Sequence, residues 1–302
     1  MLGVFAAFAG IGFAGTLVEA RAFVVRRQAL SVLAPGSRSL RVLHISDVHL
    51  MPYQRAKQAW VGRLGNLDPD LVVCTGDNLG HARAVPALLE CFTGLFRYPG
   101  VFVLGSNDYY GPRLKNPARY LLPEGGRRKI KGRPLPTADL VRGFTDAGWL
   151  DLSNRRTRLD LPGANLEFVG VDDPHLRRDR YARVAGPAAT DAALTIGVSH
   201  APYRRVLDAM TADGAGLILA GHTHGGQLCL PGVGALVTNC DLPRSQAKGL
   251  SRWYVPQEHR AAARHGTWLH VSAGIGTSPF TPVRFWCRPE VTLLTLHPRS
   301  AD

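Results

Sequence analysis

The stretch Arg41-Val42-Leu43-His44-Ile45-Ser46-Asp47-Val48-His49 places an apolar run directly before two residue types that bind metal ions. Its content of Val, Leu and Ile is typical of a buried strand. Residues two apart on an extended segment point to the same side, so Asp47 and His49 are expected to face one ion together. We therefore predict a strand at 41–46 that ends in a pair of metal ligands.

Four further segments place Asp, Asn or His at comparable points of the chain, mostly just after an apolar, β-branched run. They are Gly76-Asp77, Gly105-Ser106-Asn107-Asp108, Ser199-His200 and Gly221-His222-Thr223-His224-Gly225-Gly226-Gln227. Ligands at the ends of strands converge on one rim of a sheet. The five segments together therefore predict a single site, which one segment alone would not.

The ligand types indicate which ions the site binds. Imidazole and carboxylate together suit Zn, Mn or Fe better than Ca or Mg. A carboxylate on a tight glycine turn, such as that of Asp77, is able to bridge two ions. Two ions about 3.5–4 Å apart clamp a phosphoryl group and lower the pKa of a shared water to roughly 7. The pattern predicts metal-assisted phosphoester hydrolysis and leaves the choice among Mn, Zn and Fe open.

Strands that alternate with helices indicate the α/β class. Strands are expected at 41–46, 71–75, 101–104, 166–171, 194–199, 217–220, 268–272 and 291–296, and helices near 55–66, 82–97, 137–147 and 203–212. The helix-poor region 227–296 is expected to be more antiparallel. No Ser/Gly-rich linker divides the chain, and about 260 residues suffice for one substantial core. We therefore expect a single catalytic domain at 41–302.

The set of motifs resembles the calcineurin-like metallophosphoesterase superfamily from about residue 41 to about residue 296. Segment 221–227, Gly274-Ile275-Gly276-Thr277-Ser278 and Pro282-Val283-Arg284-Phe285 are similar to its membrane-anchored branch. That branch includes phosphodiesterases and UDP-diacylglucosamine pyrophosphatases. The resemblance implies a four-layer α/β-β/α sandwich, in which helices flank two mixed sheets. The sequence pattern alone does not indicate the second sheet.

The resemblance also implies a role for each matching residue. It places Asp47, His49 and His224 on a first metal, Asp77 between the metals, and His200, His222 and Asn107 on a second. It further implies that a hydroxide bridging the two ions attacks phosphorus in line, while the ions stabilise the charge that develops on the oxygens.

The third of the five motifs, Gly105-Ser106-Asn107-Asp108, departs from the family pattern Gly-Asn-His-Asp/Glu. In strict register Ser106 falls on the ligand Asn, and Asn107 falls on the catalytic His that protonates the leaving group. Either Asn107 binds the second metal through a small loop shift, or that metal is held less tightly. An amide cannot act as a general acid, so we expect leaving groups that need little protonation, such as a phosphate. His175 is an alternative proton donor, whereas the preceding Asp172-Asp173 is expected to form a turn.

Residues Leu2 to Val18 carry no charge, and we expect an N-terminal transmembrane helix at 1–20 followed by a basic linker at 21–40. A signal peptide and a buried soluble helix are the alternatives. Arg21, Arg26 and Arg27 follow the apolar stretch, so the positive-inside rule places the catalytic domain on the cytoplasmic side. Five cysteines, an odd number, agree with a reducing compartment.

The net charge is +13, and basic residues concentrate in a Pro- and Gly-rich loop that follows the third motif. Candidate substrate-binding residues are Arg127, Arg128, Arg177 and Arg178. Basic residues beside a phosphoester site attract an anionic phosphoester substrate, and they equally suit docking on membrane lipids. Nucleic-acid binding is not expected, because no stacking aromatic residues interleave the basic ones.

The sequence leaves three functions open. The first is hydrolysis of a membrane-associated phosphodiester or pyrophosphate, for instance a lipid-linked or nucleotide-linked intermediate. The second is a phosphomonoesterase or protein phosphatase on the same fold. The third is a membrane scaffold with little or no catalytic activity, which the Ser106-Asn107 departure would explain.

Overall fold

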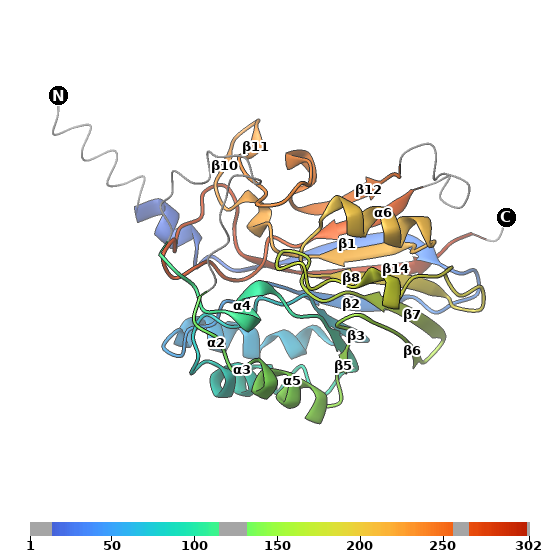
Figure 1. Ribbon diagram of the computed structural model, residues 1–302, viewed down its shortest axis with the longest axis horizontal. Coiled ribbons are helices and arrows are strands. Elements are labelled where there is room, and N and C mark those ends of the chain that lie inside the picture. Colours follow the sequence, from blue (N-terminus) through green and yellow to red (C-terminus); the bar gives the residue numbers. More distant parts are fainter. Residues whose placement is uncertain (1–13, 115–131, 256–265, 301–302) are drawn as a thin grey trace.

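The computed structural model describes residues 14–114, 132–255 and 266–300, and within them two six-stranded sheets lie face to face (Figure 1). The first sheet has the order β1 (Val24–Leu33), β14 (Glu290–Pro298), β2 (Leu40–Ile45), β3 (Leu71–Cys74), β4 (Gly100–Phe102) and β5 (Leu150–Asp151). The second has the order β12 (Gly249–Trp253), β13 (Thr267–Val271), β9 (Leu217–Ala220), β8 (Leu194–Ser199), β7 (Ala164–Gly170) and β6 (Arg155–Leu161).

Helices cover the outer face of each sheet, which makes four layers (Figure 1). The first sheet is covered by α2 (Arg55–Gly62), α3 (Val85–Phe92) and α5 (Thr137–Asp146), and the second by α6 (Arg204–Ala212). The short helix α4 (Ser106–Tyr109) follows β4, and a small hairpin is formed by β10 (Cys229–Leu230) and β11 (Gly234–Ala235).

Three buried apolar clusters lie between the four layers. Val42, Val73 and Val101 of the first sheet pack against residues such as Phe168 and Ile196 of the second. The other two clusters fill the space between each sheet and its helices. Both sheets are mixed, since β14 runs antiparallel to β2 and β12 antiparallel to β13. The expected α/β fold with two mixed sheets is thus confirmed.

Strand β1 lies within 21–40, the segment for which a basic linker was expected. It pairs in parallel with β14 from Val24 to Leu33 and forms an edge of the first sheet. An edge strand keeps polar residues on its solvent side, and Arg26 and Arg27 are exposed. Because of these charges, the sequence pattern did not indicate a strand here. The antiparallel strand β6 was likewise not anticipated, because Arg155-Arg156-Thr157-Arg158 offers few apolar residues.

The expected single-pass N-terminal anchor, with a cytoplasmic catalytic domain, needs correction. Across residues 14–114, 132–255 and 266–300, no helix combines the length and the apolar character needed to cross a membrane. Residues 1–13 of the expected anchor lie outside the described residues. The helical turn at 14–19 is bound to the domain, since the Glu19 carboxylate accepts hydrogen bonds from the backbone N–H groups of Trp286 (3.0 Å) and Cys287 (2.6 Å).

Candidate metal centre

The candidate ligands lie at the carboxyl ends of strands from both sheets. Asp47 and His49 follow β2, Asp77 follows β3, His200 follows β8, and the segment 221–227 follows β9. Strands β2 and β3 are parallel neighbours in one sheet, and β8 and β9 are parallel neighbours in the other. The ends of these four strands therefore meet at one edge of the sandwich, which is where ligands gather in open α/β sheets.

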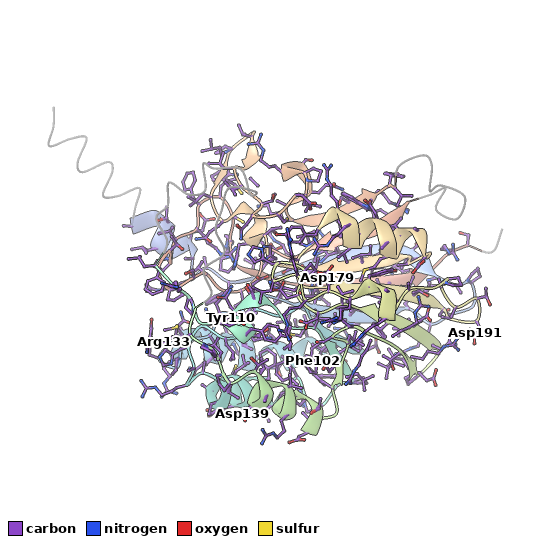
Figure 2. The ribbon with its side chains drawn as sticks, viewed as in Figure 1. Phe102, Tyr110, Arg133, Asp139, Asp179 and Asp191 are labelled. Atoms are coloured by element: carbon purple, nitrogen blue, oxygen red, sulfur yellow. The ribbon has the colours of Figure 1, made fainter. Side chains whose placement is uncertain are left out.

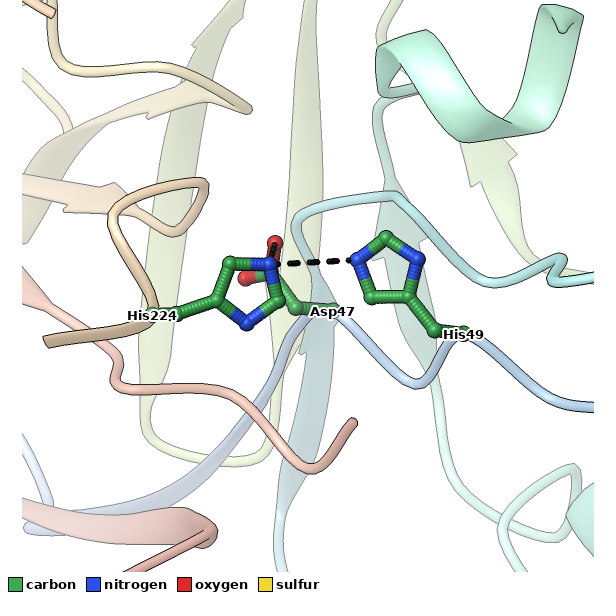
Figure 3. A group of neighbouring side chains, drawn as sticks. All are labelled: Asp47, His49 and His224. Atoms are coloured by element: carbon green, nitrogen blue, oxygen red, sulfur yellow. Dashed lines mark hydrogen bonds and ion pairs between the residues drawn. The ribbon is translucent and has the colours of Figure 1, made fainter. Parts of the chain in front are cut away.

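Asp47, His49 and His224 form a first group whose ligand atoms all lie within 4.8 Å of one another (Figure 3). His49 Nε2 lies 3.2 Å from His224 Nε2, and the two rings are stacked with centroids 5.0 Å apart. His224 Nε2 lies 3.7 Å from Asp47 Oδ1. Two ring nitrogens and a carboxylate oxygen around a common point form a ligand set typical of Zn and related ions.

Asp47 also belongs to a second group, with Asp77 and His200, within the same 4.8 Å limit. His200 Nε2 lies 3.4 Å from Asp77 Oδ1, and His222 Nδ1 lies 3.3 Å from His200 Nε2. The second group is almost completely buried. The two groups together have the composition of a site for two ions.

Asp77 contacts ligands of both groups, because its Oδ2 lies 3.5 Å from His49 Nε2 while its Oδ1 faces His200. Asn107 lies against the same carboxylate. Its backbone N–H donates to Asp77 Oδ1 (2.6 Å) and its side-chain amide to Oδ2 (2.7 Å). Turning that amide by 180° would place its oxygen at this position, so Asn107 is able to supply a ligand to the site. The Ser106 hydroxyl lies 3.5 Å from the Asn107 amide nitrogen.

Five candidate ligands have left-handed backbone conformations. The φ angles are 51° for Asp47, 43° for His49, 56° for Asp77, 70° for His222 and 51° for His224. Such angles are uncommon for residues other than glycine, and they concentrate at functional sites where the surrounding structure enforces them. The surrounding structure therefore holds these five residues in energetically costly turns at the strand ends.

Backbone carbonyls orient three of the four imidazoles. In each case one ring nitrogen faces a carbonyl oxygen and leaves the other nitrogen directed at the site, as in metal-binding histidines. The pairs are His200 Nδ1 with Thr75 O (2.7 Å), His224 Nδ1 with Gly276 O (3.2 Å) and His222 Nε2 with Asn239 O (3.2 Å). His49 differs, since its buried Nδ1 has no hydrogen-bond partner within residues 14–114, 132–255 and 266–300.

The charges of the site favour a cation. Burial opposes ionisation of Asp77, yet the charge on His200 holds the pKa of this carboxyl well below its usual value. Burial opposes protonation of His200 too, but the charges of Asp77 and Asp47 raise its pKa well above 6.5. Burial lowers the pKa of His49 to about 4 and that of His224 well below 6.5, so both are neutral donors of lone pairs. The residues present therefore fit two divalent ions.

Asp108, in the third motif, is hydrogen-bonded to the second motif, Gly76-Asp77. Its carboxylate accepts hydrogen bonds from the backbone N–H groups of Asp77 (2.9 Å), Asn78 (2.7 Å) and Gly105 (3.0 Å). Burial raises its pKa to about 7. Gly105 lies so close that a Cβ there would meet Asp77 Oδ1 at 2.3 Å. No role was expected for Asp108 from the sequence, although its place as the last residue of the third motif was a signal.

The structure brings His175 to the site. Its ring centroid lies 4.6 Å from that of His222, and its Nδ1 lies 3.0 Å from the Tyr203 hydroxyl. Asp173 Oδ1 accepts from the His175 backbone N–H (2.9 Å), which is the turn-forming contact expected of this acidic pair. His175 is thus held beside the second group from a different loop than the third motif.

The four candidate substrate-binding arginines have different surroundings. Arg127 and Arg128 lie outside the described residues. Arg177 is exposed, whereas Arg178 donates to Asp172 Oδ2 (2.9 Å) and stacks on the Tyr109 ring at 4.0 Å. Because the Tyr109 hydroxyl also donates to Asp172, Arg178 holds α4 against the loop that carries His175.

Three arginines of the second sheet and its helix α6 are paired with acids. Arg158 forms two hydrogen bonds with Asp191, at one end of the molecule, and Arg205 pairs with Asp179 (Figure 2). Arg156 donates to Glu167 and to neighbouring carbonyls. The excess of positive charge is therefore not gathered at the metal centre by these side chains.

Arg284 is a fully buried cation beside the fifth motif, residues 221–227. It donates to the carbonyl oxygens of Ala273 (2.7 Å) and Gly276 (2.7 Å), and its Nη2 lies 3.5 Å from His224 Nδ1. It therefore holds the loop after β13 in the position where Gly276 O orients His224.

Comparisons with known proteins agree with this geometry. The family model described as Calcineurin-like phosphoesterase matches residues 40–226, more than half of the chain. The chain is 25% identical over 304 residues to the uncharacterized metallophosphoesterase YkuE of Bacillus subtilis, which covers 97% of this chain and 92% of the relative. It is 30% identical over 151 residues to phosphodiesterase YaeI of Escherichia coli, covering 50% of this chain and 48% of the relative.

Among solved structures, a dimetal phosphatase from Danio rerio is similar at a TM-score of 0.41 and 12% identity, over 78% of this chain and 88% of that chain. The matched family model contains the candidate ligands from Asp47 to His224. This chain belongs to the calcineurin-like phosphoesterase family, whose members are metal-dependent hydrolases of phosphoric esters.

Proposed function

We propose that the protein hydrolyses a phosphodiester or a pyrophosphate bond with the help of two divalent ions, Mn, Zn or Fe. The observation that carries the proposal is the pair of three-ligand groups that share Asp47 at the edge of both sheets. Two such ions, when bound, supply Lewis acidity and lower the pKa of a water to roughly 7. Asp77 and the carbonyl-oriented imidazoles supply the fixed geometry that in-line attack on phosphorus requires.

The third motif favours a leaving group that needs little protonation. The amide of Asn107, which lies against Asp77, cannot donate a proton as an acid. A phosphate or nucleotide leaving group departs as an anion without such help, which favours a diester or pyrophosphate over a poorly activated monoester. Introducing a general acid by Asn107→His should accelerate substrates with poor leaving groups, and an unchanged rate would count against this reasoning.

His175 is the residue that we propose as proton donor for substrates that do need one. The Tyr203 hydroxyl faces its Nδ1, and its ring lies against His222 beside the second ligand group. Proton transfer by a positioned histidine contributes about 10²–10⁴-fold to a rate.

Exposed apolar side chains beside the fifth motif support a substrate with an apolar part. Leu228 and Phe285 are paired by a β-bridge and are 42% and 40% exposed, and the neighbouring Trp286 is 63% exposed. Gln227, the last residue of the motif, donates to the carbonyl oxygen of Val283 in the same loop. A lipid-linked pyrophosphate, such as the UDP-diacylglucosamine type, carries both an apolar group and the reactive bond.

The test compares substrates with the full-length chain, because β1 begins at Val24 and a shorter chain would lose an edge strand. A nitrophenyl phosphodiester, a nitrophenyl monoester, a UDP-linked pyrophosphate and its lipid-linked form are offered with Mn, Zn or Fe, and Asp77→Asn serves as control. We expect turnover of diester or pyrophosphate that is lost in the variant. Turnover of the monoester alone would establish a phosphomonoesterase instead, and two bound ions without turnover of any substrate would favour a binding role.

A further inference from the structure

A chain of buried side chains leads from Asp47 into the interior between the two sheets. The Ser46 hydroxyl donates to Asp47 Oδ2 (2.5 Å), and the Thr75 hydroxyl donates to Ser46 Oγ (2.7 Å). His44 Nε2 lies 3.0 Å from Thr75 Oγ1, and His44 Nδ1 lies 2.8 Å from His270 Nδ1. All five side chains have no exposed surface.

The direction of every hydrogen bond follows from the carboxylate at one end. Ionised Asp47 only accepts, so it takes the single proton of Ser46, and Ser46 must accept from Thr75. Because Thr75 donates its single hydroxyl proton to Ser46, it can only accept from His44, so His44 Nε2–H donates to Thr75 Oγ1.

The same reasoning assigns the two imidazoles. A neutral His44 with its proton on Nε2 presents Nδ1 as an acceptor, and His270 must donate to it from Nδ1–H. Burial and the neighbouring His270 hold the pKa of His44 well below its usual range, and burial lowers the pKa of His270 to about 3, in agreement with two neutral rings. The remaining nitrogen, His270 Nε2, is a buried acceptor without a hydrogen-bond partner among the described residues.

The arrangement joins the two halves of the fold. His44 belongs to β2 in the first sheet and His270 to β13 in the second, so their contact crosses the interior of the sandwich. Gly221 closes over the other end, because a Cβ there would lie 1.8 Å from Ser46 Oγ. A polar chain in this apolar layer, with an unsatisfied nitrogen at its end, costs free energy that an apolar core would not.

We propose that Ser46, Thr75, His44 and His270 are positioning residues that fix the orientation of Asp47 and thereby set the affinity of both ion positions. The inference rests on the proposed function, since it requires Asp47 to bind ions. This series of hydrogen bonds occupies one lone pair of Asp47 Oδ2, and its four donors all point along the series toward that oxygen. Asp47 Oδ1 is left directed at His224. Because Asp47 belongs to both ligand groups, its orientation affects both ions.

The experiment removes one link without touching a ligand. Thr75→Val deletes the hydroxyl while leaving the backbone carbonyl that orients His200, and Thr75→Ser keeps the hydroxyl. The matched control is Thr292→Val. Thr292 lies opposite His44 in the β2–β14 register and is fully buried, and its hydroxyl has no hydrogen-bond partner in the part of the chain that the structure describes.

Isothermal titration of the metal-free full-length protein with Mn and with Zn provides the first readout. We expect Thr75→Val to bind ions about 10–100-fold more weakly, the usual effect of losing a group that orients a metal ligand. Thr75→Ser and Thr292→Val should bind as the unaltered protein does. Equal affinity of Thr75→Val and the unaltered protein would overturn this inference alone, whereas an unaltered protein that binds no divalent ion would overturn the proposed function as well.

The second readout is the tautomer of each histidine in ¹⁵N-edited NMR spectra, which a purely space-filling role would not determine. At neutral pH we expect a neutral His44 with its proton on Nε2 and a neutral His270 with its proton on Nδ1. The opposite tautomer at His44, or a charged ring at either position, would break the donor chain and refute the inference whatever the ion affinity.

Discussion

At the scale of single residues, the ligands of this protein are defined by the groups that hold them. Asp108, Arg284 and three backbone carbonyls determine which atoms of Asp77 and the imidazoles face the site. None of these contacts is encoded in the spacing of the ligands themselves. For Asn107, the sequence shows the departure from the family pattern, but only the structure shows the contact with Asp77.

His175→Gln should slow substrates according to their leaving group. With an alkyl phosphodiester we expect a loss of about 10²–10⁴-fold in kcat, because the proton donor is missing. A nitrophenyl diester leaves readily as an anion and should change little. Steady-state rates with both substrates test this, and His297→Gln is the control, since His297 contacts Ser39 at the opposite end of β2. Equal losses with both leaving groups would exclude His175 as an acid.

Lys57→Met should change how stability depends on pH. Lys57 is buried and donates to Val48 O (2.9 Å), and burial lowers its pKa to about 7. The unfolded chain keeps this proton up to about pH 10.5, so between pH 7 and 10.5 unfolding takes up a proton and a rising pH stabilises the native protein. This group alone contributes up to about 1.4 kcal/mol per pH unit.

The variant lacks that titration. We expect Lys57→Met to be about 1–3 kcal/mol more stable than the unaltered protein at pH 7 and to lose the advantage as the pH rises towards 10. Urea unfolding at pH 7, 8 and 9 measures the difference. An advantage that grows with pH would show that the sign of the Lys57 contribution is opposite.

At the scale of elements, strands buried on both faces were the easiest to predict and edge strands the hardest. Strands β2, β3, β8 and β9 lie inside a sheet and consist largely of apolar residues, so their positions follow from the sequence. Strand β1 lies at an edge and alternates buried with exposed positions, which gave it the appearance of a basic linker. Its partner β14 is more than 250 residues away in the chain, and no local pattern encodes such a pairing.

Gly100→Ala should destabilise the pairing of β4 with its surroundings. A Cβ at Gly100 would lie 2.3 Å from the Trp149 ring, which is itself buried. Overpacking of this kind costs about 1–3 kcal/mol. Gly62→Ala in α2 is the control, because its nearest neighbour is 3.8 Å away and alanine favours a helix by about 0.5–1 kcal/mol. Urea unfolding of both variants should give opposite signs, and a neutral Gly100→Ala would mean that Trp149 moves aside.

At the scale of the whole molecule, the metal centre joins the two sheets. Asp47 and Asp77 come from the first sheet, whereas His200 and His224 come from the second. Ions bound at this edge therefore strengthen the contact between the two layers, which also meet through apolar packing, the His44–His270 contact and the contact of His200 with Thr75 O. The native state alone presents both sets of ligands, so binding is coupled to folding.

Ion binding should raise the thermal stability of the protein. At an ion concentration 100 times the Kd, the stabilisation is about 2.7 kcal/mol for one site, which corresponds to roughly 4 °C in Tm for a chain of this size. Chelation should reverse the shift, and Asp77→Asn should reduce it, because this residue contacts both ligand groups. Scanning calorimetry tests this, and a Tm that does not respond to Mn, Zn or Fe would contradict a two-ion site.

The sequence by itself determined which strands end in ligands, the α/β class and the chemical type of the site, because these depend on local composition and on spacing along the chain. The tertiary structure alone decided the pairing of β1 with β14, the meeting of His44 with His270, and the position of His175 beside His222. Each of these contacts joins segments that are distant in the sequence. Their physical cause is the burial of apolar faces between layers, which brings together residues that no local pattern relates.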